Sequence, residues 1–137
     1  MGRTSRQAPC GIGEARSRLR TGQAYLEVAE LVLDEQTREE FLGVSTGLAV
    51  LAGIAASDSI CCARAGSRHR GADHRGAARL LEQAVPDGKA LATTLLRLLD
   101  LKDEAHYGVG SVTPPKARDA VRWAARLTER AREEVER

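Results

Sequence analysis

The sequence predicts an all-α protein, an up-and-down bundle of four to five helices, from three observations. Most of its hydrophobic residues are alanine, leucine and valine, and aromatic residues make up only 3% of the chain. Alanine and leucine favour helices, whereas sheets favour β-branched and aromatic residues. Apolar residues also recur at steps of three and four, which is the period of a helix face. Clusters of glycine and proline divide this pattern into segments of helical length, and none of them predicts a strand.

Five segments are expected to be helices. They span about residues 14–33, 38–65, 73–84, 88–107 and 113–137. Asp87 is a good N-cap for the fourth segment, and Thr113 followed by Pro114 is a typical helix start. The second segment is apolar on most of its circumference, so we expect it at the centre of the bundle. Its Gly43, Gly47 and Gly53 each cost about 1 kcal/mol of helix propensity relative to alanine, which close approach of another helix could recover.

The length of the chain suits one domain, whose hydrophobic core is large enough to be stable without a covalent cross-link. Residues 1–13 combine Gly, Ser, Pro and Arg without periodicity, and we expect a flexible N-terminal tail there. Residues 14–137 should form a single helical-bundle domain. The net charge of +2 is too small to imply a polyanionic partner by itself.

The cysteines and the apolar runs bear on the cellular compartment. Of Cys10, Cys61 and Cys62, the last two are adjacent and should point in different directions from a helix. We therefore expect no disulfide and no zinc site, and interpret Cys61 and Cys62 as small buried hydrophobes. The longest apolar run, residues 48–56, is far shorter than the ~18 residues that span a membrane, and the N-terminus does not read as a signal peptide. The sequence thus predicts a cytoplasmic protein without a membrane segment.

Asp58 interrupts the apolar pattern of the second helical segment. It lies on the same helical line as Val44, Leu48, Leu51 and Ala55. A carboxylate on such a line loses its water and needs a partner. One interpretation is a hydrogen bond or ion pair to a neighbouring helix, and the other is a site acid or a group that orients one.

A second polar group lies at the end of the fourth segment. Lys102 and His106 are four residues apart and share a helix face, with Asp103 beside them. A histidine beside a lysine tends to stay neutral and could act as a base near pH 7. Lys102 could offset charge that develops on a phosphate oxygen. Alternatively, this turn has reached the surface, where Lys and His stabilise a helix C-terminus.

A basic segment covers residues 64–79, in which Asp73 is the one acidic residue. Its members that we assign to nucleic-acid binding are Arg64, Arg68, Arg70, His74 and Arg75. Several arginines this close create a positive field that could contact phosphates, although such runs are often solvated loops. With so few aromatic residues for base stacking, the contacts would be to the backbone and weakly sequence-specific.

The motifs of common cofactor and metal sites do not occur. The sequence has no glycine-rich phosphate loop after a strand, no HExxH and no nucleophile elbow. Its three histidines are not spaced as a ligand pair on one helix face. We therefore expect no cofactor and no bound metal.

The layout resembles the HEPN superfamily, especially small stand-alone actinobacterial members. The resemblance covers roughly residues 15–134. It is carried by the alanine-rich second segment with Asp58, by the basic turn Arg70-Gly71-Ala72-Asp73-His74, and by residues 101–107 before the final helix. It implies a two-fold homodimer and, in many members, a metal-independent endoribonuclease. Other members are RNA-binding, antitoxin-linked or scaffolding modules.

The nuclease members use an arginine followed four to six residues later by a histidine. Upstream of His106 that arginine position holds Leu101, and the nearest basic residue is Lys102. Lysine cannot form the two parallel hydrogen bonds with which an arginine binds a phosphate. Arg68 and His74 do have the spacing, but they lie between the second and third segments.

The sequence therefore predicts a HEPN-like homodimer that acts on RNA, either as an endoribonuclease or as a degenerate RNA-binding module. His106 would be the general acid or base and Lys102 the charge stabiliser, with Asp58 or Asp103 orienting them. Two alternatives remain. One is a non-enzymatic module that dimerises and docks a protein partner, and the other is a nonspecific DNA-binding protein.

Overall fold

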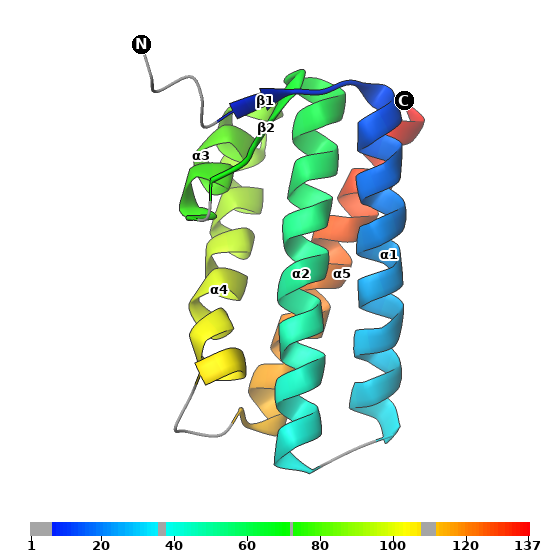
Figure 1. Cartoon of the computed structure of the whole chain (residues 1–137). Coiled ribbons are helices and arrows are strands. Elements are labelled where there is room, and N and C mark those ends of the chain that lie inside the picture. The colour runs from blue at the N-terminus through cyan, green and yellow to red at the C-terminus, as the bar shows by residue number, and fades with distance from the viewer. Residues whose placement is uncertain (1–6, 36–37, 72, 108–111) are drawn as a thin grey trace.

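The structure, a computed structural model, describes residues 7–35, 38–71, 73–107 and 112–137, apart from the side chains of Glu35, Asp103, Glu104, His106 and Tyr107. In chain order its elements are β1 (Gln7–Pro9), α1 (Ile12–Glu35), α2 (Glu39–Arg64), β2 (Ser67–His69), α3 (Arg75–Ala84), α4 (Gly88–Tyr107) and α5 (Pro114–Glu136) (Figure 1). This confirms the predicted all-α bundle, and the helix boundaries agree closely with the expected segments. The two short strands were not expected.

Helix α2 occupies the centre of the bundle, as its composition predicts. Helices α1, α4 and α5 run along it, and the short α3 crosses one end against α4 (Figure 1). Among the described residues, α2 is the helix long and apolar enough to cross a membrane, with a mean hydropathy of 1.6. However, 83% of that apolar window is buried inside the protein. Such burial is typical of the core helix of a soluble protein.

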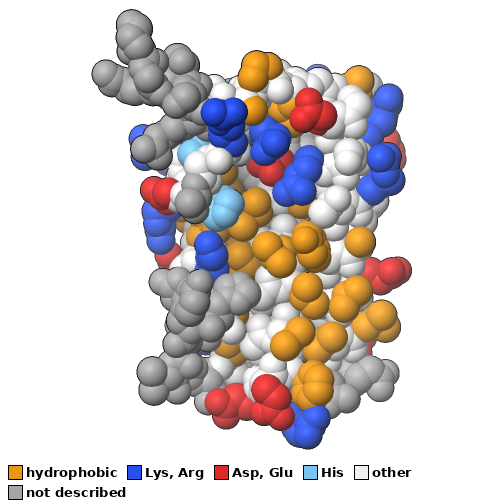
Figure 2. Space-filling view, in the orientation of Figure 1, with side chains coloured by type: hydrophobic (Ala, Val, Ile, Leu, Met, Phe, Trp, Pro, Cys, Tyr) orange, Lys and Arg blue, Asp and Glu red, His pale blue; other side chains and the backbone are white. Residues whose placement is uncertain are grey.

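The rotation of α2 about its axis differs from the expected one. Val44 and Leu51, placed on a buried stripe by their spacing, are 51% and 38% exposed. Val28 and Leu31 of α1 are also exposed, at 45% and 59%, and we call these four residues the apolar α1–α2 face. Figure 2 shows hydrophobic side chains gathered over α1 and α2, below a group of basic side chains. Because α1, α4 and α5 cover the other sides of α2, this side stays open.

Small residues allow close approach at two points of the bundle. A Cβ atom on Gly53 of α2 would lie 2.5 Å from Cδ1 of Leu98 in α4, so the expected close approach is confirmed there. At Gly43 it would lie 3.6 Å from the carbonyl oxygen of Ala105, which is an ordinary contact. Gly88 begins α4 directly after the turn that follows α3. A Cβ atom there would lie 2.4 Å from the carbonyl oxygen of Glu82, which belongs to the backbone and has no rotamer to relieve the clash.

Residues 7–13 differ most from the prediction of a flexible tail without a disulfide, while residues 1–6 of the predicted tail lie outside the described part of the chain. Strand β1 pairs with β2 in antiparallel register, with Gln7 opposite His69. The backbone N–H of Cys10 donates to the carbonyl oxygen of Gly66 at 2.9 Å. Cys10 and Cys62 form a disulfide with an S–S distance of 2.09 Å, which corrects the prediction that no disulfide forms. That prediction was wrong because it weighed local cysteine spacing, whereas these cysteines are separated by 52 residues.

Gly88→Ala should lower the free energy of unfolding by about 1–3 kcal/mol, because the added methyl group meets backbone oxygen atoms. Gly13→Ala is the matched control, since it also lies at a helix start but has nothing within 4 Å of an added Cβ. Urea unfolding followed by circular dichroism measures both. Equal stability of the two variants would contradict this account of Gly88.

Reduction of the disulfide should lower the free energy of unfolding by about 2–4 kcal/mol, because the cross-link closes a long loop of the unfolded chain. The measurement is urea unfolding with and without a thiol reductant. Cys61→Ala should keep the response to reductant, because Cys61 is not part of the disulfide. Cys10→Ser should be as unstable as the reduced protein and should no longer respond.

Candidate functional site

A basic pocket lies at one end of the bundle, where α1, α2, β2 and the loop before α3 meet. Its volume is about 410 Å³. Its polar lining consists of Arg18, Asp58, Arg68, His69, Arg70 and His74. These side chains come from three separate parts of the chain, so the pocket exists only in the folded protein. The basic group in the upper part of Figure 2 lies over this end of the bundle.

Asp58 forms the acidic floor of the basic pocket. Its side chain is 8% exposed, and Arg18 Nε donates a hydrogen bond to Asp58 Oδ2 at 3.2 Å. The predicted ion pair to a neighbouring helix is thereby confirmed, with α1 as that helix. Burial raises the pKa of the Asp58 carboxyl above its ordinary value, while the positive charges of Arg18 and Arg68 oppose that rise. Asp58 therefore anchors Arg18 and also lines the pocket.

Strand β2 brings Arg68 and His69 into the pocket lining. His69 Nε2 lies 2.7 Å from the carbonyl oxygen of Asp73, and because a carbonyl only accepts, Nε2 carries the hydrogen and donates. The imidazole packs over Gly76, where a Cβ atom would lie 2.4 Å from His69 Cε1. Glycine at this position in the first turn of α3 thus leaves the room that the ring needs.

His74 is the second histidine of the pocket. It is half-buried and directly precedes α3, where its side chain makes no capping hydrogen bond. Burial lowers the pKa of His74, and the positive charges of Lys102 and His69 lower it further, against the opposing effect of Asp73. A histidine with a lowered pKa is neutral at pH 7 and can accept a proton. The environment that we predicted for His106, a histidine close to Lys102, therefore occurs at His74.

The catalytic residues predicted from sequence are only partly placed. Asp58 lines the pocket, and the half-buried Lys102 lies near enough to act on the pKa of His74. The backbone of α4 continues through Asp103 and His106, but both side chains lie outside the described part of the structure. Whether Lys102 and His106 face a shared cleft thus stays a prediction.

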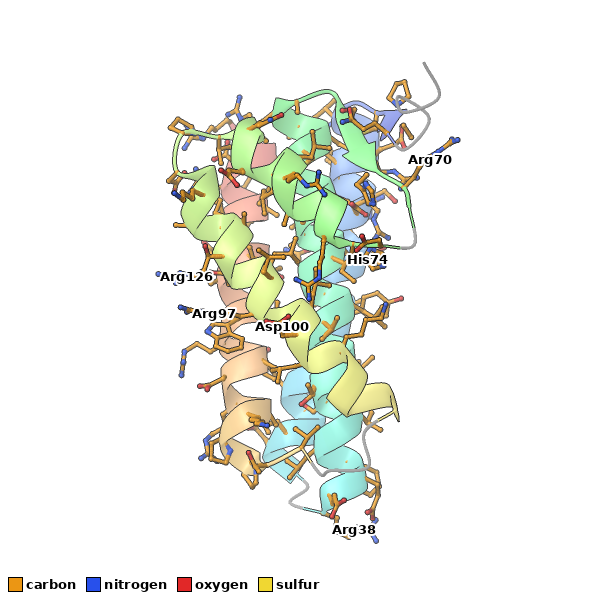
Figure 3. All side chains as sticks on the ribbon, turned by 90° about the vertical axis from the view of Figure 1, so that its left-hand side faces the viewer. Arg38, Arg70, His74, Arg97, Asp100 and Arg126 are labelled. Atoms are coloured by element: carbon orange, nitrogen blue, oxygen red, sulfur yellow. A yellow bond between two sulfur atoms is a disulfide. The ribbon has the colours of Figure 1, made fainter. Side chains whose placement is uncertain are left out.

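The predicted nucleic-acid-binding residues divide into two groups. Arg68, Arg70 and His74 line the basic pocket, and Figure 3 shows Arg70 and His74 at the same side of the bundle, with Arg70 extending away from it. Arg64 and Arg75 are not part of the lining. Arg64 Nε donates to Glu134 Oε1 at 2.6 Å, and Arg75 donates to Asp100 Oδ1 at 2.8 Å.

The ion pair of Arg64 has a structural cause. The Glu134 side chain is only 2% exposed, and a buried carboxylate needs charged donors around it. Burial raises its pKa, but hydrogen bonds from Arg130 and Arg64 lower it more, so the pKa of Glu134 lies below its ordinary value. The ion pair of Arg64 thus links α2 to α5, and this side chain stabilises the fold.

Two pocket residues were missed as site residues by the sequence reasoning. Arg18 lies in a helix whose polar positions looked like an ordinary solvated face. Its only signal was that Asp58, on the next helix, needed a cationic partner. His69 belongs to the basic segment, but nothing in the local sequence shows that its ring packs over Gly76.

Among the described residues, no three His, Cys, Asp or Glu side chains gather in a way that could hold a metal ion. No family model matches the sequence, and a search of curated proteins finds no relative. The chemistry of the site therefore rests on its geometry: an excess of guanidinium groups, an anchored carboxylate and a histidine with a lowered pKa.

Asp58→Asn should change how stability depends on pH. Because the folded-state pKa of Asp58 is raised above 3.8, the native protein binds this proton more tightly than the unfolded chain does. Stability from this group is present at low pH and falls as pH rises from about 4 through the raised pKa. Wild type should thus lose stability relative to Asp58→Asn over that range in urea unfolding. A wild-type curve that gains stability over the variant with rising pH would contradict this.

Proposed function

We propose that the basic pocket binds the phosphodiester backbone of RNA and that the chain is a HEPN-like, metal-independent endoribonuclease with His74 as its base. The single observation that carries this proposal is the presence of a histidine with a lowered pKa in a pocket with several arginines. The protein would act in the cytoplasm.

The charge of the pocket favours a phosphate. Its lining holds three arginines, Arg18, Arg68 and Arg70, against one carboxylate, that of Asp58. Arg18 is engaged by Asp58, and Arg68 lines the same pocket with a further positive charge. Guanidinium groups bind phosphate oxygens in bidentate geometry. Because the charge is local while the net charge of the chain is only +2, binding would depend on this pocket.

The histidine favours RNA over DNA as a substrate. In the proposed reaction, the 2′-hydroxyl oxygen attacks phosphorus and gives its proton to neutral His74. The bond from phosphorus to the 5′ oxygen breaks, and this oxygen leaves with a proton taken from water or an acidic side chain. Arg68 and Lys102 would stabilise the negative charge on the phosphorus oxygens. DNA lacks the 2′-hydroxyl group and would bind without being cleaved.

The spacing of Arg68 and His74 adds support. It matches the arginine–histidine spacing of nuclease members of the HEPN superfamily, and both residues line the same pocket. The family resemblance had placed the catalytic pair at the end of the fourth helix, where Leu101 replaces the arginine. His106 with Lys102 remains the competing assignment for the base.

A second candidate function is protein interaction, which the apolar α1–α2 face favours. Val28, Leu31, Val44 and Leu51 are between 38% and 59% exposed, and Figure 2 shows hydrophobic side chains gathered over α1 and α2, the helices that carry them. Contiguous exposed apolar side chains commonly mark a protein interface. We propose that this face binds a second copy of the chain, which would give the homodimer expected from the resemblance.

The experiment measures binding and cleavage of a labelled single-stranded RNA in the presence of a chelator, at low and moderate salt. Arg68→Ala with Arg70→Ala should weaken binding roughly tenfold or more, which corresponds to about 1.4 kcal/mol, and should flatten the salt dependence. Arg97→Ala with Arg126→Ala is the control of equal charge, since both residues lie far from Arg70 in Figure 3. The control pair should bind RNA like wild type.

His74→Ala should abolish cleavage and leave binding nearly unchanged, because His74 is neutral and contributes little charge. If His106→Ala abolishes cleavage and His74→Ala does not, the base is His106. If His74→Ala binds but no variant or wild type cleaves, the pocket is an RNA-binding module without nuclease activity. A chain that forms a dimer and binds no RNA even at low salt would contradict the proposal and favour the interaction module.

A further inference from the structure

We propose that the Cys10–Cys62 disulfide is a redox switch that holds strand β2, with Arg68 and His69, in the wall of the basic pocket. The inference rests on the proposed function only for its biological meaning, because the state of the pocket wall can be measured without RNA.

The disulfide lies at the base of the β1–β2 ribbon. Cys10 directly follows β1, and Cys62 lies in the last turn of α2, shortly before β2. Next to it, the N–H of Cys10 donates to the carbonyl oxygen of Gly66. The covalent bond thus keeps the two strands in register at the end where the ribbon joins the bundle.

The ribbon is too short to be stable alone. Each strand has three residues, and isolated two-stranded ribbons are marginally stable in water even when longer. Arg68 pairs with Ala8, and His69 pairs with Gln7. Loss of the disulfide would therefore let β1 detach, and β2 would lose the partner that fixes its backbone beside the pocket.

The opposite wall of the pocket does not depend on the disulfide. Arg18 and Asp58 lie on α1 and α2, which also share a buried bond from Ser59 Oγ to the carbonyl oxygen of Ala15 at 2.7 Å. Reduction should thus leave Arg18 and Asp58 in place and displace Arg68 and His69. Reduction should therefore change the position of the β2 wall of the pocket and leave the α1–α2 wall in place.

The third cysteine does not interfere with the switch. Cys61 is buried, and burial together with the negative charge of Asp58 raises the pKa of its thiol to about 12. At neutral pH it therefore has almost no thiolate, which is the species that attacks disulfides. The disulfide can open only by reaction with an external thiol.

The exposure of the two cysteines determines which sulfur atom the external thiolate attacks. Cys10 is partly exposed, whereas Cys62 is 3% exposed, so the thiolate of a dithiol reductant attacks the Cys10 sulfur. The S–S bond breaks, Cys62 leaves and takes a proton, and a mixed disulfide forms at Cys10. The second thiol of the reductant then displaces Cys10 and closes the reductant's own disulfide. The reductant supplies both electrons, and the protein gains two thiols.

The switch also accounts for a disulfide in a protein proposed to be cytoplasmic. In a reducing compartment, disulfides of ordinary proteins are rare, and those that form are commonly transient or redox-sensing. In this protein, oxidation would complete the pocket wall and reduction would loosen it.

The test compares the oxidised and reduced protein in the Cys61→Ala background by two readouts. The first is amide hydrogen exchange of β2 and of α2, and the second is RNA affinity. The expected result is that reduction speeds exchange of β2 by local opening, while the slowest amides of α2 speed up only as far as the lowered free energy of unfolding requires. The RNA affinity should be roughly five- to tenfold lower after reduction. The double variant Cys10→Ser with Cys62→Ser should behave like the reduced protein under oxidising conditions.

Three further outcomes are decisive. Equal exchange and equal affinity in both states would overturn the switch. Loss of protection in α2 beyond what the lowered free energy of unfolding accounts for would also overturn it, because reduction would then loosen the helical bundle itself and not only the β2 wall. Faster exchange of β2 by local opening, with no RNA binding in either state, would support the switch and contradict the proposed function.

Discussion

The antiparallel packing of α1 on α2 is the constraint on which the rest of the structure depends. Two buried hydroxyl groups fix its register at opposite ends of the hairpin. Ser45 Oγ donates to the carbonyl oxygen of Ala29 at 2.8 Å, and Ser59 Oγ donates to that of Ala15 at 2.7 Å. In the same register, Arg18 meets Asp58. A shift by one helical turn would separate this ion pair and remove the acidic floor of the pocket.

That register also explains why the two ends of the hairpin differ. At one end it brings Cys10 to Cys62 and so places β1 beside β2. The basic pocket therefore has one wall built on packed helices and another held by a short ribbon. The site combines the Arg18–Asp58 ion pair, held by packed helices, with Arg68 and His69 on a short strand.

The remaining charged residues show that abundance of arginine is a poor guide to function. Arg130 binds Asp87 through two hydrogen bonds of 2.6 and 2.7 Å, and also binds the buried Glu134. Asp87 does precede α4 as predicted, but its side chain joins α5 to the α3–α4 turn. Arg64 belongs to the same group through Glu134. Arginines of one basic segment thus serve the fold at one position and line the pocket at another.

The sequence by itself determined the helical fold, the helix boundaries and the need of Asp58 for a cationic partner, because these follow from local periodicity, turn residues and desolvation. The same period of three and four residues relates the apolar residues of α5 that the structure buries, which are Ala117, Val121, Ala124, Leu127, Ala131 and Val135. Only the tertiary structure decided that the partner of Asp58 is Arg18 and that Cys10 bonds to Cys62. It also decided that Val44 and Leu51 stay exposed, and that Arg64 pairs with Glu134 and does not line the pocket. These depend on the register and rotation of packed helices, which join residues too distant in sequence for a local pattern to relate.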